Sequence, residues 1–235
     1  MANRWLISPI LRTEAVLNMD DDVNVSYAAL RCMFSVWLRS PYSLVATDVR
    51  AIVDCAKTTE RCKYGGPFDY LARERLQGIG LSYNMALPRV LLASRIYHAA
   101  FAASFYHVVH VPSPPTLATV APPQRDSLER IVRELLCDDI AFNYAAANAS
   151  IHFPRPAGSR PRRQGAIRAA PLLVRAPVAS FPESNAAGAL TLERGMKLKR
   201  RECANRLSIL FSSDGGRTPF RLEQQFWQAT CTVSK

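Results

Sequence analysis

Apolar and polar positions over the first fifty residues predict a strand, a helix and a second strand. Residues 14–19 (EAVLNM) are typical of a short strand, and three aspartates follow it directly. A helix is expected after Ser26, which is suited to cap it, and Pro41 is expected to end it. Its predicted apolar stripe is Leu30, Phe34, Trp37 and Leu38. Residues 44–49 (LVATDV) are again strand-like, and this order of elements favours a parallel α/β sheet.

The rest of the chain alternates between loop-like and helical patterns. Residues 55–80 are rich in charge and glycine and are expected to form a loop, whereas residues 81–111 are apolar and predict a strand followed by a helix. Residues 126–136 predict a helix capped by Asp126, with an apolar stripe of Leu128, Ile131, Val132 and Leu135. A second helix is expected to begin at the acidic pair Asp138 and Asp139. Residues 196–211 predict a basic helix with one face formed by Cys203, Leu207 and Leu210.

These patterns divide the chain into one domain with interruptions. Residues 1–153 and 189–222 are assigned to the domain, and residues 111–125 are read as a proline-rich linker within it. Residues 154–188 form an Arg/Pro/Ala-rich insertion that we expect to be disordered, and residues 223–235 form a tail.

The composition gives the chain a basic net charge. Such a charge usually suggests a nucleic acid, a membrane surface or an acidic ligand as partner, but its location weakens that interpretation. The chain has 235 residues, 49% of them hydrophobic, and a net charge of +11, which is typical of a globular domain with a basic surface. Residues 154–180, however, contain six arginines and no acidic residue, so most of the excess lies in the predicted insertion. No interleaving of aromatic and basic residues accompanies this charge, so we predict no nucleic-acid partner.

Cysteine and hydropathy patterns bear on the compartment. The six cysteines contain no C-x-x-C pair, and the four histidines do not complete a zinc ligand set. N-x-S sequons at Asn24 and Asn148 have meaning only in a secreted or lumenal protein. The sequence shows no signal-peptide pattern at its start, and its most apolar region, residues 81–111, is interrupted by Arg89 and Arg95 and is read as core.

Three charged clusters are candidates for chemistry, and each has a simpler reading. Asp20, Asp21 and Asp22 follow a strand and could hold Mn²⁺ or Mg²⁺ against phosphate oxygens, or they could form a solvated turn. Asp138 and Asp139 could stabilise positive charge at a sugar's anomeric carbon, or they could only complement a helix dipole. The third cluster could place an arginine against a leaving diphosphate or could be a wet helix face; its members are Lys197, Lys199, Arg200 and Arg201.

The order of these clusters, with the segments around them, resembles glycosyltransferase family 64, the exostosin and exostosin-like family. NRW…TEAVLNMDDDV (residues 3–23) is similar to the family's "NRF…TEAVL-x-x-DDD", and LCDDIAFNYAAANAS (residues 136–150) is similar to "NC-E/D-DIAMNFLVANVT". Further blocks that resemble family segments are FSVWLRSPYSLVATDVR (34–50), YNMALPRVLLASRIYHAAF (83–101), KRRECANRLSILF (199–211) and Thr218-Pro219-Phe220.

The resemblance implies a GT-A type α/β fold with a parallel-rich sheet and a Mn²⁺-dependent, retaining transferase. It implies transfer of N-acetylhexosamine from a UDP-sugar donor to a glycan or glycolipid acceptor. Metal binding is carried over to Asp22 and the catalytic roles to Asp139 and Arg200. The residues carried over as nucleotide-sugar ligands are Arg4, Asp20, Asp21, Arg50 and Asp138, and the implied disulfide joins Cys137 to Cys203.

The resemblance also implies an endoplasmic reticulum or Golgi lumen location, membrane association in the full-length architecture and an oligomer with itself or a related transferase. Family domains begin upstream of this chain, so the first strands are expected to be missing, and a catalytically inactive, partner-binding remnant is the alternative function. Three positions depart from the family pattern: Leu136 replaces an asparagine, Arg201 is expected to crowd a small position, and Ala46 replaces a loop glycine.

Overall fold

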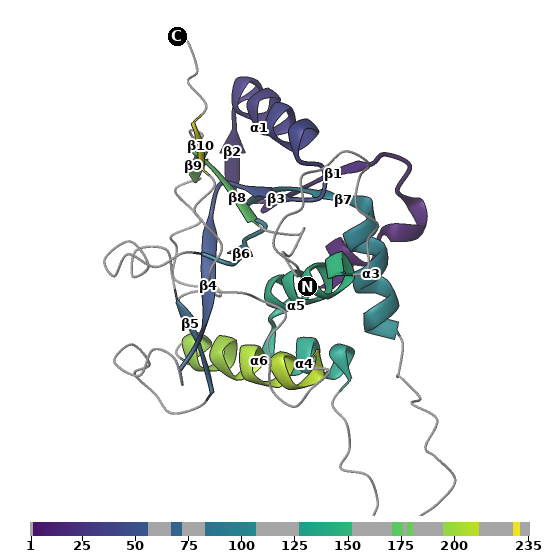
Figure 1. Cartoon of the computed structure of the whole chain (residues 1–235), viewed down its shortest axis with the longest axis vertical. Coiled ribbons are helices and arrows are strands. Elements are labelled where there is room, and N and C mark those ends of the chain that lie inside the picture. Colours follow the sequence, from purple (N-terminus) through teal and green to yellow (C-terminus); the bar gives the residue numbers. More distant parts are fainter. Residues whose placement is uncertain are drawn as a thin grey trace, which may run out of the picture.

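A computed structural model describes most of the region that the sequence assigns to the domain (Figure 1). It describes residues 2–55, 67–71, 83–106, 127–151, 171–175, 178–180, 195–211 and 228–230. The predicted linker at 111–125 lies outside these residues, as do most of the insertion and most of the tail.

The main sheet is mixed, with four strands in one direction and one against them. Its order is β1 (Ala15–Met19), β7 (Val90–Ser94), β3 (Leu44–Ala46), β8 (Pro171–Arg175) and β10 (Gln228–Thr230). Strand β7 is antiparallel to both β1 and β3, whereas β3, β8 and β10 pair in parallel. The predicted strand–helix–strand unit is therefore present, but β7 lies between its two parallel strands.

Alternating side chains bury both faces of this sheet. Val45, Val90 and Leu92 pack with α1 (Tyr27–Arg39) on one face. Leu44, Ala46, Leu91 and Ala93 join the core formed with α3 (Arg95–Tyr106) and α5 (Asp138–Ile151) on the other face. Figure 1 shows α1 on one side of the sheet and α3 with α5 on the opposite side. The layers are thus helix, sheet and helix.

Helix α1 has the predicted start but a different buried face. The Ser26 hydroxyl accepts a hydrogen bond from the Ala29 N–H, which confirms Ser26 as the cap. The buried residues are Ala29, Met33, Val36 and Trp37. Phe34 and Leu38 are 44% and 58% exposed, so the predicted stripe was wrong at those two positions. Apolar residues occur on two faces of this helix, and spacing alone did not show which face meets the sheet.

A second set of strands extends away from the main sheet toward the last helix. Strand β4 (Val49–Asp54) pairs antiparallel with β5 (Phe68–Leu71) and with β6 (Met85–Ala86). Strand β5 packs against α6 (Met196–Leu210) (Figure 1). The predicted strand at 44–49 is divided into β3 and the start of β4, and β5 corrects the reading of residues 55–80 as loop. The remainder of that stretch, residues 56–66, lies outside the described residues, as do residues 72–80.

Helices α4 (Leu128–Leu135) and α6 carry most of the predicted features. The α4 stripe is buried as predicted, but Ser127 caps this helix instead of Asp126, because its hydroxyl accepts the Arg130 N–H. In α6, Cys203 and Leu207 are fully buried, whereas Leu210 is 37% exposed. Leu136 follows α4 with φ of 51°, a left-handed conformation that suits asparagine or glycine better than leucine.

Part of the predicted disordered insertion is ordered. Strand β8 lies inside residues 154–188 and occupies an interior position in the main sheet. Strand β9 (Val178–Ser180) pairs with β2 (Val23–Val25), the strand that begins directly after the three aspartates. The prediction of disorder was therefore wrong for these two stretches, because periodicity over a few residues gives no sign of pairing with distant strands.

Candidate active site

The three aspartates form an open turn at the carboxyl end of β1. The β1–β7 pairing continues one residue past the strand, where the Asp20 N–H donates to the Arg89 carbonyl at 3.2 Å, and β2 begins at Val23. Asp21 is exposed and Asp22 is half-buried. Neither carboxylate takes part in a hydrogen bond or ion pair within the described part of the chain. These two carboxylates can therefore accept a cation without breaking an existing contact.

Arg4 connects this turn to the interior of the molecule. It belongs to the short 3₁₀-helix η1 (Ala2–Trp5), and its Nη1 lies 2.6 Å from Asp20 Oδ1. Burial lowers the pKa of the Arg4 guanidinium, but the hydrogen bond to Asp20 and the charges of Asp20, Asp138 and Asp139 outweigh it and raise the pKa. Arg4 therefore lies within electrostatic reach of both acidic clusters.

The second acidic cluster is buried at the start of α5. Asp138 and Asp139 are 8% and 6% exposed, and both lie in the first turn of the helix, where its dipole favours negative charge. The indole N–H of Trp5 donates to Asp138 Oδ2 at 2.9 Å. Burial, followed by the charge of Asp139, raises the pKa of the Asp138 carboxyl, while Trp5 and Arg4 oppose the rise.

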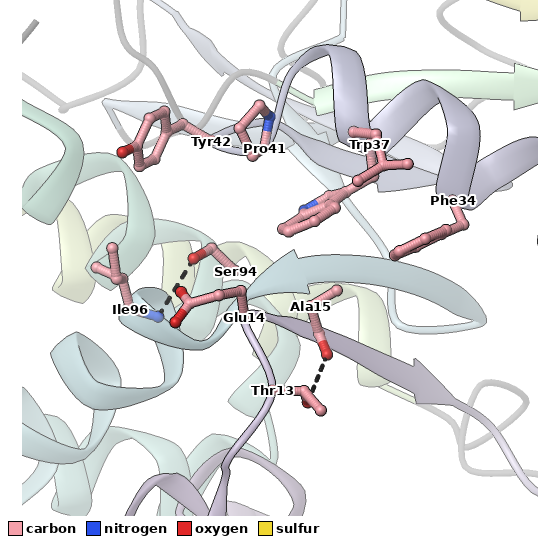
Figure 2. Close-up of a pocket in the computed structure, with 10 residues that line it drawn as sticks. Thr13, Glu14, Ala15, Phe34, Trp37, Pro41, Tyr42, Ser94 and Ile96 are labelled. Atoms are coloured by element: carbon pink, nitrogen blue, oxygen red, sulfur yellow. Dashed lines mark hydrogen bonds between the residues drawn. The ribbon is translucent and has the colours of Figure 1, made fainter. Parts of the chain in front are cut away.

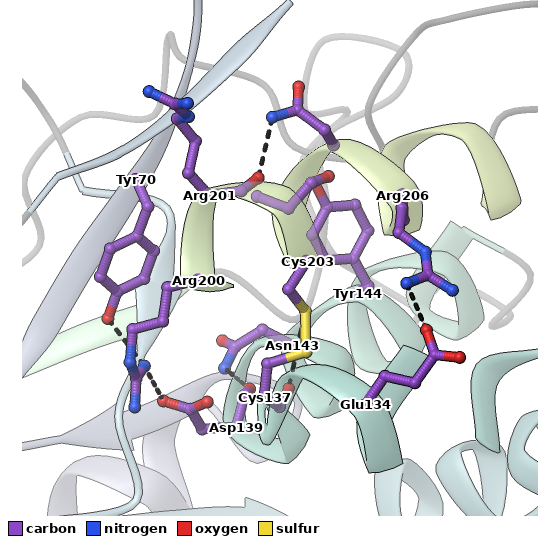
Figure 3. Close-up of a disulfide and its surroundings, with 12 residues drawn as sticks. Tyr70, Glu134, Cys137, Asp139, Asn143, Tyr144, Arg200, Arg201, Cys203 and Arg206 are labelled. Atoms are coloured by element: carbon purple, nitrogen blue, oxygen red, sulfur yellow. Dashed lines mark hydrogen bonds and ion pairs between the residues drawn. A yellow bond between two sulfur atoms is a disulfide. The ribbon is translucent and has the colours of Figure 1, made fainter. Parts of the chain in front are cut away.

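Asp139 forms an ion pair with Arg200 from α6 (Figure 3). Arg200 Nη1 lies 2.6 Å from Asp139 Oδ2 and also donates to the Tyr70 hydroxyl at 3.2 Å. The Arg200 guanidinium lies 5.5 Å from the centre of the Tyr70 ring, and the charge of Asp139 raises the pKa of Arg200. Asp139 Oδ1 is buried and has no hydrogen-bond partner among the described residues. A buried carboxylate oxygen without a partner is unusual, and a catalytic role is one explanation for it.

A disulfide holds the two halves of this ion pair together. Cys137 and Cys203 are bonded across 66 residues of sequence, with their Cα atoms 6.5 Å apart, as the family resemblance implied. Asp139 lies two residues after the first cysteine and Arg200 three residues before the second (Figure 3). Cys32 and Cys55 are also disulfide-bonded. The bond therefore restrains α5 and α6 at the point where the ion pair forms.

Asn143 attaches α5 to the neighbouring strand. Its side-chain amide donates to the carbonyls of Ala86 and Asp139 and accepts the Ala86 N–H, all within 2.9 Å. The side chain is 2% exposed, so these bonds are shielded from water. They fix the first turn of α5, and with it the direction of the acidic pair.

The remaining predicted residues lie near this centre. Arg50 donates to Asp48 Oδ1 at 2.6 Å and to the Val49 carbonyl at 2.8 Å, and its charge acts on the Tyr70 hydroxyl. Arg201, expected to crowd the site, points away from Asp139 in Figure 3. Ala46 is the buried last residue of β3, not part of a loop. The structure thus groups Arg4, Asp20, Asp138, Asp139 and Arg200 through charge contacts.

Sequence reasoning missed Trp5 and Tyr70. Trp5 stands in the NRW motif beside Arg4, but nothing in the motif shows that its N–H reaches a residue 133 positions away. Tyr70 lies in the stretch interpreted as loop, and its contact with Arg200 spans 130 positions. The only local signal for Tyr70 was its place in the apolar run FDYL.

A separate pocket of about 590 Å³ lies at the other end of β1 from the acidic turn (Figure 2). Aromatic side chains of α1 form one wall, and the start of β1 forms another. Its lining residues are Thr13, Glu14, Ala15, Phe34, Trp37, Leu38, Pro41, Tyr42, Ser94 and Ile96.

Within the described residues, no group of three or more His, Cys, Asp or Glu side chains is arranged to hold a metal ion. One or two carboxylates can hold Mg²⁺ when substrate phosphates supply further ligands.

This combination of a mixed α/β sheet, carboxylates at a strand end and a buried carboxylate–arginine pair is suited to transferring a group from an anionic donor. The family model for the glycosyl transferase family 64 domain matches residues 1–226, so the chain belongs to that family and is a glycosyltransferase. Membership implies a nucleotide-sugar donor and a glycan acceptor. A comparison with curated proteins gave no match. In the described part of the chain, no helix is both long enough and apolar enough to cross a membrane.

Proposed function

We propose that this protein transfers an N-acetylhexosamine, GlcNAc or GalNAc, from a UDP-sugar to a glycan or glycolipid acceptor, with retention of anomeric configuration and with Mn²⁺. The observation that carries the proposal is the buried Asp139–Arg200 pair, whose remaining carboxylate oxygen has no partner within the described residues. Glycosyl transfer requires a carboxylate near the anomeric carbon of the sugar and a positive charge near the leaving group, and this pair supplies one of each.

The residues at the acidic turn fit a hard divalent cation. Mn²⁺ and Mg²⁺ prefer oxygen ligands, and one or two carboxylates suffice when a diphosphate supplies others. Asp22 is half-buried and Asp21 is exposed, and both are free of other contacts within the described residues. We assign metal binding to Asp22 and donor contacts to Asp20 and Asp21. Bound Mn²⁺ would neutralise charge that develops on the leaving diphosphate.

The chain's own residues then divide the reaction between them. Asp138 accepts hydrogen bonds from sugar hydroxyls and orients the ring. As the bond from the anomeric carbon to the diphosphate oxygen breaks, its electron pair leaves with the diphosphate, Arg200 interacts with the departing oxygens and Asp139 stabilises the oxocarbenium-like sugar. An acceptor hydroxyl then bonds to the anomeric carbon from the face that the diphosphate left, which retains the configuration, and the hydroxyl proton passes to a departing phosphate oxygen. Their ion pair keeps both charges in position before the donor arrives. Arg4 and Arg50 add positive charge on the nucleotide side.

We further propose a GT-A type fold and a lumenal location. Strand β1 supports the first proposal because it ends in the acidic turn, and ligands of open α/β sheets bind outside the carboxyl ends of the strands. The disulfides support an oxidising compartment, the endoplasmic reticulum or Golgi lumen, for a membrane-associated enzyme.

Turnover by the protein tests the proposed function. UDP release from UDP-GlcNAc and UDP-GalNAc should require Mn²⁺ and a glycan acceptor, and Asp139→Asn and Asp22→Asn should each reduce it at least about a hundredfold. Glu129→Gln is a matched control, because it removes a surface carboxylate from a neighbouring helix. Unchanged turnover in both site variants would contradict the proposal. No turnover and no nucleotide binding by the unmodified protein would favour the inactive remnant.

A further inference from the structure

Two adjacent residues of η1 connect the two acidic clusters. Arg4 pairs with Asp20 in the open turn, and Trp5 donates its indole N–H to Asp138 in the buried pair. Arg4 is 39% exposed at its side chain, whereas Trp5 is fully buried. The proposed function uses Arg4 but leaves the Trp5 hydrogen bond without a role.

Trp5 is held rigidly against the helix that carries Asp138. Its ring stacks on Phe142 of α5, with centroids 4.0 Å apart and planes 21° from parallel. The Phe101 and His98 rings of α3 lie 6.5 and 5.7 Å away. Because Phe142 is one turn along the same helix, the stack fixes the indole relative to the Asp138 carboxylate.

His98 adds no positive charge near Asp138 at neutral pH. It is fully buried, and burial lowers the pKa of its imidazole to about 4. Its Nε2 lies 3.2 Å from Asn18 Nδ2, and since an amide nitrogen only donates, Nε2 is the accepting nitrogen. The groups that act on the Asp138 charge are therefore Asp139, Trp5, Arg4 and the backbone N–H of Asp138 itself, with Arg200 paired to Asp139.

We propose that Trp5 is a positioning residue for the donor sugar: its indole N–H fixes Asp138 as an oriented carboxylate that receives sugar hydroxyls. This inference rests on the proposed function. A carboxylate has about four lone-pair sites; the indole and the backbone N–H of Asp138 itself occupy two of them, which leaves sites for the ligand. Burial and the charge of Asp139 both favour protonation of Asp138, and a protonated carboxyl would lose acceptor capacity. The Trp5 donor opposes that loss without adding a charge.

The substitution Trp5→Phe tests the proposal, because it removes the N–H and keeps an aromatic ring for the stack. Calorimetry should compare UDP with UDP-GlcNAc, both with Mn²⁺. Trp5→Phe should leave UDP binding unchanged and weaken UDP-GlcNAc binding about tenfold, the loss of one hydrogen bond to a charged group. The acid limb of kcat/KM should also move to higher pH, because the pKa of Asp138 rises without the donor.

Phe101→Leu is the matched control. It removes another ring of the same core, 6.5 Å from the Trp5 ring, but leaves the Phe142 stack and the indole N–H in place, so it should lower stability without moving the acid limb. If Trp5→Phe and Phe101→Leu behave alike in stability, sugar binding and pH profile, Trp5 is only a core residue and the proposal is wrong. Failure of the unmodified protein to bind either nucleotide would overturn the proposed function and this inference together.

Nuclear magnetic resonance tests the hydrogen bond without relying on turnover. The chain has three tryptophans, and the indole N–H signal of Trp5 is the one missing from Trp5→Phe. This signal should move as Asp138 takes up a proton, and it should stay in place over the same pH range in Asp138→Asn. An unchanged titration in Asp138→Asn would show that the indole does not report on that carboxylate and would overturn the proposal.

Discussion

The two acidic clusters use the same residue type in opposite ways. At the turn after β1, Asp21 is exposed, Asp22 is half-buried, and neither carboxylate forms a hydrogen bond or ion pair with the described residues. At the start of α5, Asp138 and Asp139 are almost fully buried, and each is held by a specific partner. The turn can gain a ligand at little structural cost, whereas the buried pair is built into the fold. This difference is the basis of our proposal that the turn binds the donor and the buried pair performs the chemistry.

The largest expected effect is at the disulfide that supports the buried pair. The double substitution Cys137→Ser with Cys203→Ser opens a loop of 66 residues and should lower the free energy of unfolding by about 4 kcal/mol. Denaturant titration measures this change. Because Cys32 and Cys55 are also disulfide-bonded, the substitution isolates this bond where a reducing agent would not. A loss below about 1 kcal/mol would show that the site does not depend on the disulfide.

The second-largest loss of stability is expected when the buried ion pair is broken. Asp139→Asn leaves the Arg200 charge, 19% exposed, without its partner and should lower the free energy of unfolding by about 3 kcal/mol. Glu134→Gln is the comparison, because Glu134 pairs with Arg130 and Arg206 at the surface and should matter much less. Thermal or denaturant unfolding measures both variants, and equal losses would remove the distinction between buried and exposed pairs.

A smaller effect on stability is expected at Leu136, where the backbone leads into the helix that carries the buried pair. Leu136 has φ of 51°, and a left-handed residue other than glycine costs about 1 kcal/mol. Leu136→Gly should therefore be about 1 kcal/mol more stable than Leu136→Ala, which shortens the side chain but keeps the strain. Chemical unfolding of the two variants side by side measures the difference. A more stable alanine variant would argue against strain at this position.

The smallest effect on stability is expected at the open turn. Asp22→Asn should change the free energy of unfolding by less than about 0.5 kcal/mol, because its carboxylate forms no hydrogen bond or ion pair with a described residue. The same variant should nevertheless abolish Mn²⁺-dependent UDP binding. Unfolding curves and calorimetry on one preparation check both parts. A large loss of stability would mean that the turn is structural and would weaken the contrast.

The sequence predicted the features that depend on neighbouring residues. The strand that ends in three aspartates, the Ser26 cap and the α4 stripe all follow from patterns within one turn or strand. The family resemblance added the Cys137–Cys203 bond, which no local pattern indicated. Residues that belong to motifs can therefore be named as site candidates from the sequence.

Features that depend on distant pairing were not predictable in this way. Strand β8 lies in an Arg/Pro/Ala-rich stretch and forms because β3 and β10 flank it. Tyr70 becomes part of the site because β5 packs on α6, and Trp5 because η1 packs on α5. The cap of α4 was misplaced by one residue because Asp126 and Ser127 are both good caps. Tertiary packing, and not the local sequence, decides features of this kind.

The central claim is that the open turn binds the diphosphate and the buried pair carries out sugar transfer. Calorimetry of UDP with Mn²⁺ on the unmodified protein, Asp22→Asn and Asp139→Asn, read beside turnover of the same three samples, tests it most directly. We expect both variants to lose turnover, but only Asp22→Asn to lose UDP binding. Undiminished UDP binding in Asp22→Asn, or equal loss of binding in both variants, would contradict the division of roles.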